Sequence, residues 1–236
     1  MLIGNWAGLS RAAMLAVMLC GACGPTLAAA PAVTPDQTSS ALPPSAAEVA
    51  ADAVVGVSGF RSALFGMSQA DVKAAIIKDF SLKPEAILTG ENAAERTQVL
   101  TALVPNLLDG GGTAQVSYIF GYKTKGLIQV GISWSHATDT SITPDELYAD
   151  GDVLRSHFMN AGYKPDSVKT GLVLPNGLLL FRGEDADGHA TILILQGSFK
   201  ASSDGKQRTL TPSALALLYS ASPENPDVFK LAPGQF

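Results

Sequence analysis

The chain has 236 residues, of which 47% are hydrophobic and 16% charged, and its formal net charge is −5 at pH 7. This length allows one domain or two small ones. The acidic balance argues against binding to nucleic acid and against general attraction to anionic lipid.

The first thirty residues have the pattern of an export signal. Arg11 precedes an apolar run over residues 12–22, and small residues follow at 21–24 and 28–30. A basic residue, a short apolar core and small residues at a cleavable site are typical of a signal peptide. The run is shorter than the roughly 20 residues that a transmembrane helix needs. We therefore expect an exported protein that is periplasmic or anchored at the outer membrane.

Both cysteines, Cys20 and Cys23, lie inside this leader, so the rest of the chain has no thiol for a disulfide, a nucleophile or a metal. Two alternatives stay open for Cys23. Gly21-Ala22-Cys23 resembles the end of a bacterial lipoprotein signal, which would make Cys23 the lipidated first residue. Alternatively, a signal peptidase cuts near residues 28–30 and leaves no lipid anchor.

Residues 31–57 are rich in Ala, Pro and Ser and predict a disordered tether, within which residues 46–55 could form a brief helix. Residues 58–236 are predicted to form a single α+β domain. Its alternative organisation is two halves, 58–137 and 138–236, each running from helix to hairpin.

The first half is predicted to hold two helices and a hairpin. Ser68 caps a helix that continues to Phe80, and a second helix covers residues 93–104 before Pro105. Alternating apolar and polar residues over 116–122 and 128–134, on both sides of a glycine-containing turn, predict an antiparallel hairpin with one buried face.

The second half begins with a helix capped by Thr143 and ended by Gly162. Three strands over 168–174, 178–182 and 189–196 follow, and a last helix covers 211–219. The predicted fold class is therefore α+β, with an antiparallel sheet of about five strands in hairpins packed by about four helices.

No catalytic residue, metal site or cofactor is predicted. His136, His157 and His189 show no metal-ligand spacing. The acidic stretch at residues 185–188 lacks the later ligands of a calcium loop and is interpreted as a hairpin turn.

The hairpin carries several aromatic residues. They could bind a sugar, a peptide or an apolar ligand, or they could be cross-strand core residues, and these alternatives stay open. The candidate ligand-binding residues are Tyr118, Tyr122 and Trp134.

The segment Phe65-Gly66-Met67-Ser68-Gln69-Ala70-Asp71-Val72 resembles the helix start of small exported lipoprotein domains related to SmpA/BamE. The resemblance implies helices packed on an antiparallel hairpin sheet. It also implies a non-enzymatic envelope module that binds protein partners, and it carries over no catalytic residue.

The sequence thus favours a non-catalytic protein-binding module of a bacterial envelope. Membrane contact is expected only through a lipid anchor, in the alternative in which Cys23 is lipidated. Two alternatives remain. The first is a small hydrolase-like periplasmic enzyme built from dispersed Asp, His and Ser residues. The second is a binder of carbohydrate or apolar ligands that uses the aromatic hairpin.

Overall fold

The computed structural model describes residues 56–201, 208–231 and 234. The predicted export signal, Cys23 and nearly all of the predicted tether therefore lie outside the described residues. The described helices and strands, with two short 3₁₀ helices, are β1 (Gly59–Phe60), β2 (Ala63–Leu64), α2 (Gln69–Phe80), η1 (Pro84–Ala86), β3 (Leu88–Asn92), β4 (Thr97–Pro105), β5 (Thr113–Phe120), β6 (Leu127–Ser135), α3 (Pro144–Met159), η2 (Pro165–Ser167), β7 (Leu172–Leu174), β8 (Gly177–Glu184), β9 (Ala190–Ala201) and β10 (Arg208–Ser220).

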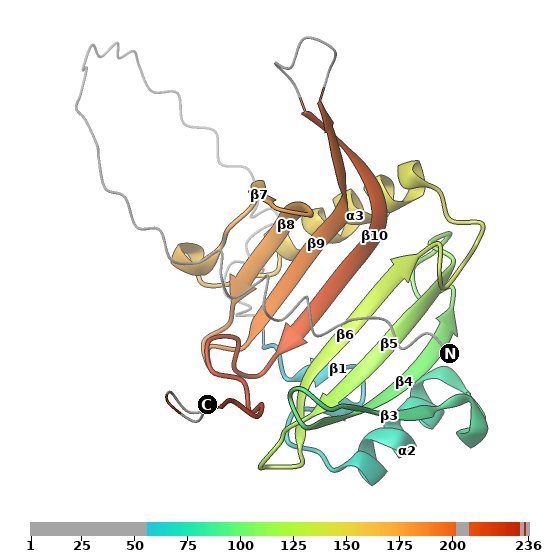
Figure 1. The fold of residues 1–236 in the computed structure, drawn as a ribbon, viewed down its shortest axis with the longest axis vertical. Coiled ribbons are helices and arrows are strands. Elements are labelled where there is room, and N and C mark those ends of the chain that lie inside the picture. Colours follow the sequence, from blue (N-terminus) through green and yellow to red (C-terminus); the bar gives the residue numbers. More distant parts are fainter. Residues whose placement is uncertain (1–55, 202–207, 232–233, 235–236) are drawn as a thin grey trace, which may run out of the picture.

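One eight-stranded sheet dominates the structure (Figure 1). Its strand order is β3-β4-β5-β6-β10-β9-β8-β7, and every neighbouring pair is antiparallel. The second sheet is the small β1-β2 pair. Each half of the chain contributes an α-helix, a 3₁₀ helix and a four-stranded meander, and the last strands of the two meanders pair at the centre. The strand order of the second half is therefore the mirror image of that of the first about the β6–β10 pair.

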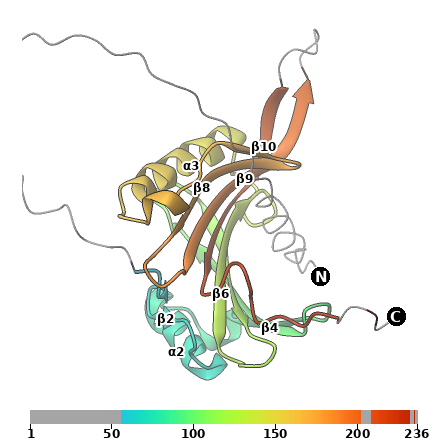
Figure 2. The same cartoon turned by 90° about the vertical axis from the view of Figure 1, so that its left-hand side faces the viewer.

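Both α-helices lie on the same side of the large sheet (Figure 2). Val72 and Ile76 of α2 are fully buried in the main core, together with Leu147 and Leu154 of α3. Gly151 lets α3 approach closely, because a Cβ at this position would lie 2.7 Å from Leu180 Cδ1. This side of the sheet is called the helix face, and the opposite side is called the far face.

The segment before α2 bridges the two halves on the helix face. Strand β1 contacts both β6 and β10. Phe60 stacks on Phe80 of α2, with ring centroids 6.4 Å apart, and on Tyr219 of β10, at 5.8 Å. Gly66 N then donates to Leu127 O at the start of β6. The N-terminal segment therefore ties both halves of the sheet together at one end.

The C-terminal tail fastens the same end of the sheet. Asp227 accepts hydrogen bonds from the backbone N–H groups of Lys123 and Thr124 in the β5–β6 turn. Further along, Phe229 N donates to Glu95 O in the β3–β4 turn. The tail thus crosses from the end of β10 to the turns of the first half.

The predicted fold class of about five strands and about four helices is wrong. The predicted helix over 93–104 is replaced by β4, and the predicted helix over 211–219 is part of β10. Within the described residues the protein is mostly β, with two α-helices and with sheets of two and eight strands. Both misassigned segments are strands because they pair with their neighbours in the large sheet, β4 with β5 and β10 with β6 and β9.

Three local predictions are confirmed. Ser68 caps α2 by accepting a hydrogen bond from Asp71 N. The hairpin predicted over 116–134 is β5–β6. Helix α3 starts with a complete capping box, in which Thr143 and Glu146 each accept from the other's backbone N–H.

We expect Leu215→Ala to lower the free energy of unfolding by about 2–5 kcal/mol, because a fully buried leucine on a central strand leaves a cavity that rigid neighbours fill poorly. Urea denaturation followed by circular dichroism measures this change. Val153→Ala on α3 is the matched control. Val153 is 64% exposed, and its truncation should change the free energy by less than about 0.5 kcal/mol. A small effect of the Leu215 variant would contradict the packing of α3 on β10.

Candidate functional site

The three aromatic residues proposed for ligand binding lie in different surroundings. Tyr118 and Trp134 are buried on the helix face, with 0% and 1% exposure. Burial, with a smaller contribution from the charge of Asp79, raises the pKa of Tyr118 above its usual range. Tyr122 is half-buried in the β5–β6 turn and meets Phe229 edge-on at 5.5 Å. The structure therefore does not bring the three rings together on one accessible surface.

The three histidines are also dispersed. His136 lies in the turn after β6, His157 on α3 and His189 just before β9. Among the described residues, the group whose donor atoms lie close enough to share an ion is Asp185, Asp187 and His189, within 4.8 Å of one another. This group forms the β8–β9 turn that the sequence marks as a hairpin.

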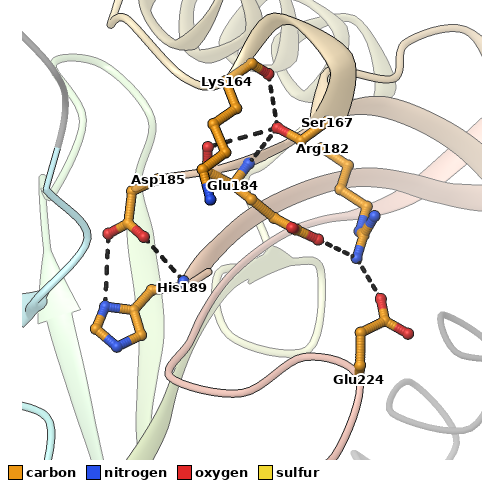
Figure 3. A network of polar contacts seen from close by, with 7 residues as sticks. All are labelled: Lys164, Ser167, Arg182, Glu184, Asp185, His189 and Glu224. Carbon is orange, nitrogen blue, oxygen red and sulfur yellow. Dashed lines mark hydrogen bonds and ion pairs between the residues drawn. The ribbon is translucent and has the colours of Figure 1, made fainter. Parts of the chain in front are cut away.

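The carboxylate of Asp185 is 1% exposed and already has its partners (Figure 3). Its Oδ1 accepts from Asp187 N at 3.0 Å and from His189 N at 2.9 Å. Its Oδ2 accepts from Val57 N at 2.7 Å and lies 3.5 Å from His189 Nδ1. These bonds satisfy a buried charge and pin the N-terminal segment to the turn. These contacts favour a structural role for Asp185.

A second polar network lies beside the first and holds the tail. Arg182 Nη2 lies 2.7 Å from Glu184 Oε1 and 2.6 Å from Glu224 Oε1 (Figure 3). The Ser167 hydroxyl donates to Lys164 O and accepts from Glu184 N. Among the described residues, no hydrogen bond joins a serine to a histidine, which is the contact by which a histidine activates a serine nucleophile.

A different candidate emerges from the far face of the large sheet. Successive residues of a strand point to opposite faces. Because Leu215 packs beneath α3, its neighbours Ala214 and Ala216 point to the far face. The register of every strand pair then assigns the remaining side chains. The part of β9 and β10 beyond Gln196 is set aside. In the rest of the described strands, the register places two charged side chains on this face, Arg182 and Glu184.

The far face has two chemically distinct halves. The first half, over β4 to β6, is neutral. It carries the apolar side chains of Val99, Leu103 and Ile119 among the polar side chains of Thr101, Gln115, Ser117, Gln129 and Ser133, and is called the polar half. Several of these side chains bond to one another, as Gln115 Nε2 does to Ser117 Oγ at 3.4 Å. The second half, over β7 to β10, carries Arg182 and Glu184 at one end and an apolar area formed by Leu174, Leu179, Ala190, Ile192, Ile194 and Leu218. We call these six residues the apolar cluster.

Sequence reasoning missed this face. The hairpin pattern showed that the side chains between the aromatic residues point away from the core, but it could not show what lies beside them. The strand partner of β6 is β10, which had been assigned to a helix. Without that pairing, the polar and apolar halves could not be placed on one continuous surface.

Comparisons with known proteins add no assignment. No family model, no curated protein and no solved structure matches the chain. Within the described residues, no helix combines the length and apolar character needed to cross a membrane.

Asp150 on α3 is the one described carboxylate that has a buried oxygen without a hydrogen-bond partner, at Oδ2. The β4–β5 loop packs against it at Gly111, where a Cβ would lie 2.9 Å from this oxygen. Burial, with a smaller contribution from the charge of Glu146, raises the pKa of Asp150 above 3.8. The group therefore costs stability when it is ionised.

We expect Asp185→Ala to lower the free energy of unfolding by about 1–3 kcal/mol, because it leaves the N–H groups of Val57 and His189 without their acceptor. The amide of Val57 should also lose protection in hydrogen exchange. Asp187→Ala, at the exposed neighbour in the same turn, is the control and should leave that amide protected. Equal behaviour of the two variants would show that Asp185 does not pin the segment.

We expect Asp150→Asn to stabilise the protein at pH 7. A carboxyl whose pKa is raised by folding is neutral in both states well below 3.8, and its ionisation costs stability as the pH rises through the folded value. The gain should therefore vanish in acid, as measured by denaturation midpoints at pH 7 and pH 3. Asp152→Asn removes an exposed partner of Arg155 and should give no gain. A gain that persists in acid would exclude ionisation as its cause.

Proposed function

We propose that this protein is an exported, non-catalytic module of a bacterial envelope that binds protein partners on the far face of its large sheet. The observation that carries the proposal is the scarcity of charged side chains on that face. Arg182 and Glu184 lie near the start of the β8–β9 turn, and Arg182 forms ion pairs with both Glu184 and Glu224. The strand centres carry neutral and apolar side chains, whereas water-facing protein surfaces are normally rich in Lys, Glu, Asp and Arg.

The chemistry of the face suits a protein partner. Uncharged polar side chains next to an apolar area are typical of the centre of protein–protein interfaces, where charged residues are depleted. The polar half offers amide and hydroxyl groups that both donate and accept hydrogen bonds. The apolar half offers area that gains free energy when a partner removes it from water.

The other polar groups support a binding role over a catalytic one. Asp185 closes a turn, Asp227 caps the β5–β6 turn, and Arg182 holds the tail. Each of these groups already has its hydrogen-bond partners within the fold. Export, and lipidation at Cys23 as one of its two forms, remain part of the proposal through the leader sequence alone.

We expect a photo-crosslinking amino acid at Gln115 or Thr101, in the full chain expressed with its leader, to capture a small and shared set of envelope proteins. Both positions are half-buried on the polar half of the far face. Mass spectrometry identifies the adducts. The same amino acid at exposed Val153 on α3 is the control and should not capture that set.

Gln115→Lys should weaken the adducts formed from Thr101, because a lysine placed against a neutral surface must be desolvated on binding. The proposal fails if the far-face positions give no protein adduct or give the same adducts as Val153. It also fails if Gln115→Lys leaves the captured set unchanged.

A further inference from the structure

The β5–β6 turn holds a carboxylate of the C-terminal tail in a pocket shaped for it. Both oxygens of Asp227 accept from Lys123 N at 3.1 Å, and its Oδ2 also accepts from Thr124 N and Thr124 Oγ1 at 2.8 Å. A Cβ at Gly121 would collide with the same Oδ2, so glycine leaves the room that this oxygen needs. Burial acts to raise the pKa of Asp227, but the hydrogen bonds from Thr124 and the charge of Lys123 outweigh it and hold the pKa below 3.8. We call Gly121, Lys123 and Thr124 the carboxylate pocket, which is suited to an ionised acid.

An aromatic ring is held beside this pocket. The ring of Phe229 meets the ring of Tyr122 edge-on, with centroids 5.5 Å apart. The guanidinium carbon of Arg96 lies 3.8 Å from the centroid of the Phe229 ring. A cation over an aromatic face is attracted to it by the ring's quadrupole. We call Tyr122 and Arg96 the aromatic slot.

The main chain of the tail is bound as well as its side chains. Tyr122 N donates to Asp227 O at 2.8 Å, and Phe229 N donates to Glu95 O at 2.9 Å. Asp227 and Phe229 are separated by one residue, Val228. The two turns therefore recognise a short segment in which a carboxylate stands two positions before an aromatic ring.

The charge of the two turns matches such a segment. The β5–β6 turn carries Lys123 and Lys125, and the β3–β4 turn carries Arg96, whereas the acidic residue of these turns is Glu95. Lys123 and Lys125 are exposed, so their charges reach solvent. A surface with an excess of positive charge attracts an acidic segment and disfavours a basic one.

The tail that occupies the site is fastened mainly by polar contacts at the surface. Besides the bonds of Asp227 and Phe229, it reaches β8 through Glu224, whose side chain is 69% exposed and pairs with Arg182 (Figure 3). A chain end held in this way opens locally at a lower free energy than the whole fold. Its opening would return the N–H groups of Lys123 and Thr124 to solvent, where another carboxylate can accept from them.

We propose that the carboxylate pocket and the aromatic slot form a peptide-docking site for a partner protein that presents an acidic residue two positions before an aromatic one. The chain's own tail occupies this site until such a segment displaces it. The site lies in the turns at the end of the sheet and does not depend on partner binding at the far face. The apparent affinity for the partner segment is lowered by the fraction of molecules in which the tail is docked.

A competition experiment on the full chain tests the proposal. The probe is a fluorescent peptide with the sequence of residues 222–231, and its binding is followed by fluorescence anisotropy. Asp227→Asn together with Phe229→Ala vacates the site, and circular dichroism checks that this variant is folded. The vacated variant should bind the peptide at least about tenfold more tightly than the unmodified chain, in which the tail competes. Asp227→Asn alone, the smaller change, should give an intermediate affinity.

Two outcomes of this experiment would overturn the proposal. The first is the absence of peptide binding to a folded vacated variant. The second is equal affinity of the vacated variant and the unmodified chain, because the tail would then not occupy the site to which the peptide binds.

Changes in the peptide test which chemistry is recognised. The Asp227→Asn peptide and the Phe229→Ala peptide should each bind the vacated variant about tenfold more weakly, because each loses a charge-assisted bond or the ring contact. A peptide that keeps residues 226, 227 and 229 and has Gly or Ser elsewhere should bind within about threefold of the parent, since flexible residues add little recognition. Equal binding of the Asp227→Asn peptide would contradict a carboxylate pocket. Loss of binding by the Gly/Ser peptide would contradict a site open to other proteins.

Changes in the site provide the matched controls. In the vacated variant, Gly121→Ala places a methyl group against the carboxylate, and Arg96→Gln removes the cation from the ring. Each should weaken peptide binding by about tenfold. Arg155→Gln removes the same charge from α3, outside both turns, and should leave the affinity unchanged. An equal loss in the Arg155 variant would reduce the binding to general electrostatic attraction and overturn the proposal.

Sedimentation of the unmodified chain at several concentrations separates a partner from a second copy. We expect a monomer at each concentration. A dimer that forms with concentration and disappears when Asp227 and Phe229 are replaced would mean that tails are exchanged between copies, and it would overturn the assignment to a different protein. The crosslinks from Gln115 and Thr101 test the far face separately, so either proposal can fail without the other.

Discussion

The structure depends on the pairing of β6 with β10, which joins two four-stranded meanders into one sheet. The register from Ala214↔Ser135 to Ser220↔Gln129 sets both surfaces at once. On the helix face, Leu215 lies opposite Trp134 and Leu217 lies opposite Ile132, and all four side chains are buried. On the far face, small residues such as Ala216 and Ser133 meet at the centre. A shift of one residue would exchange these faces, so the buried set fixes the register.

Three carboxylate contacts hold the end of this sheet. Asp185 ties the N-terminal segment to the β8–β9 turn, Asp227 ties the tail to the β5–β6 turn, and Glu224 reaches Arg182 of β8. These acids therefore belong to the scaffold. With these polar groups used within the fold, the far face stands out because its described strands carry few charged side chains. That face is the basis of the binding function that we propose.

The sequence predicted the elements whose signals are local and failed for those that depend on distant strand partners. Helices with explicit caps, at Ser68 and Thr143, were found because the cap chemistry is local. The strand over 97–105 was mistaken for a helix because Leu100 and Val104 satisfy both a helical and an alternating pattern. The segment Ala214–Leu218 was mistaken because alanine and leucine favour helices, and it is a strand because it pairs with β6 on one edge and with β9 on the other. The far face could not be predicted without this strand, and no motif marks it.

Native-state hydrogen exchange tests most directly the claim that the two halves form one sheet. We predict that the amides of β6 and β10 are the slowest to exchange and open with the same free energy, equal to that of global unfolding. The strands β3 and β7 at the two edges should exchange faster through local opening. If one half of the sheet opened at a distinctly lower free energy while the other stayed protected, the halves would be separate units and the continuous far face would not exist as described.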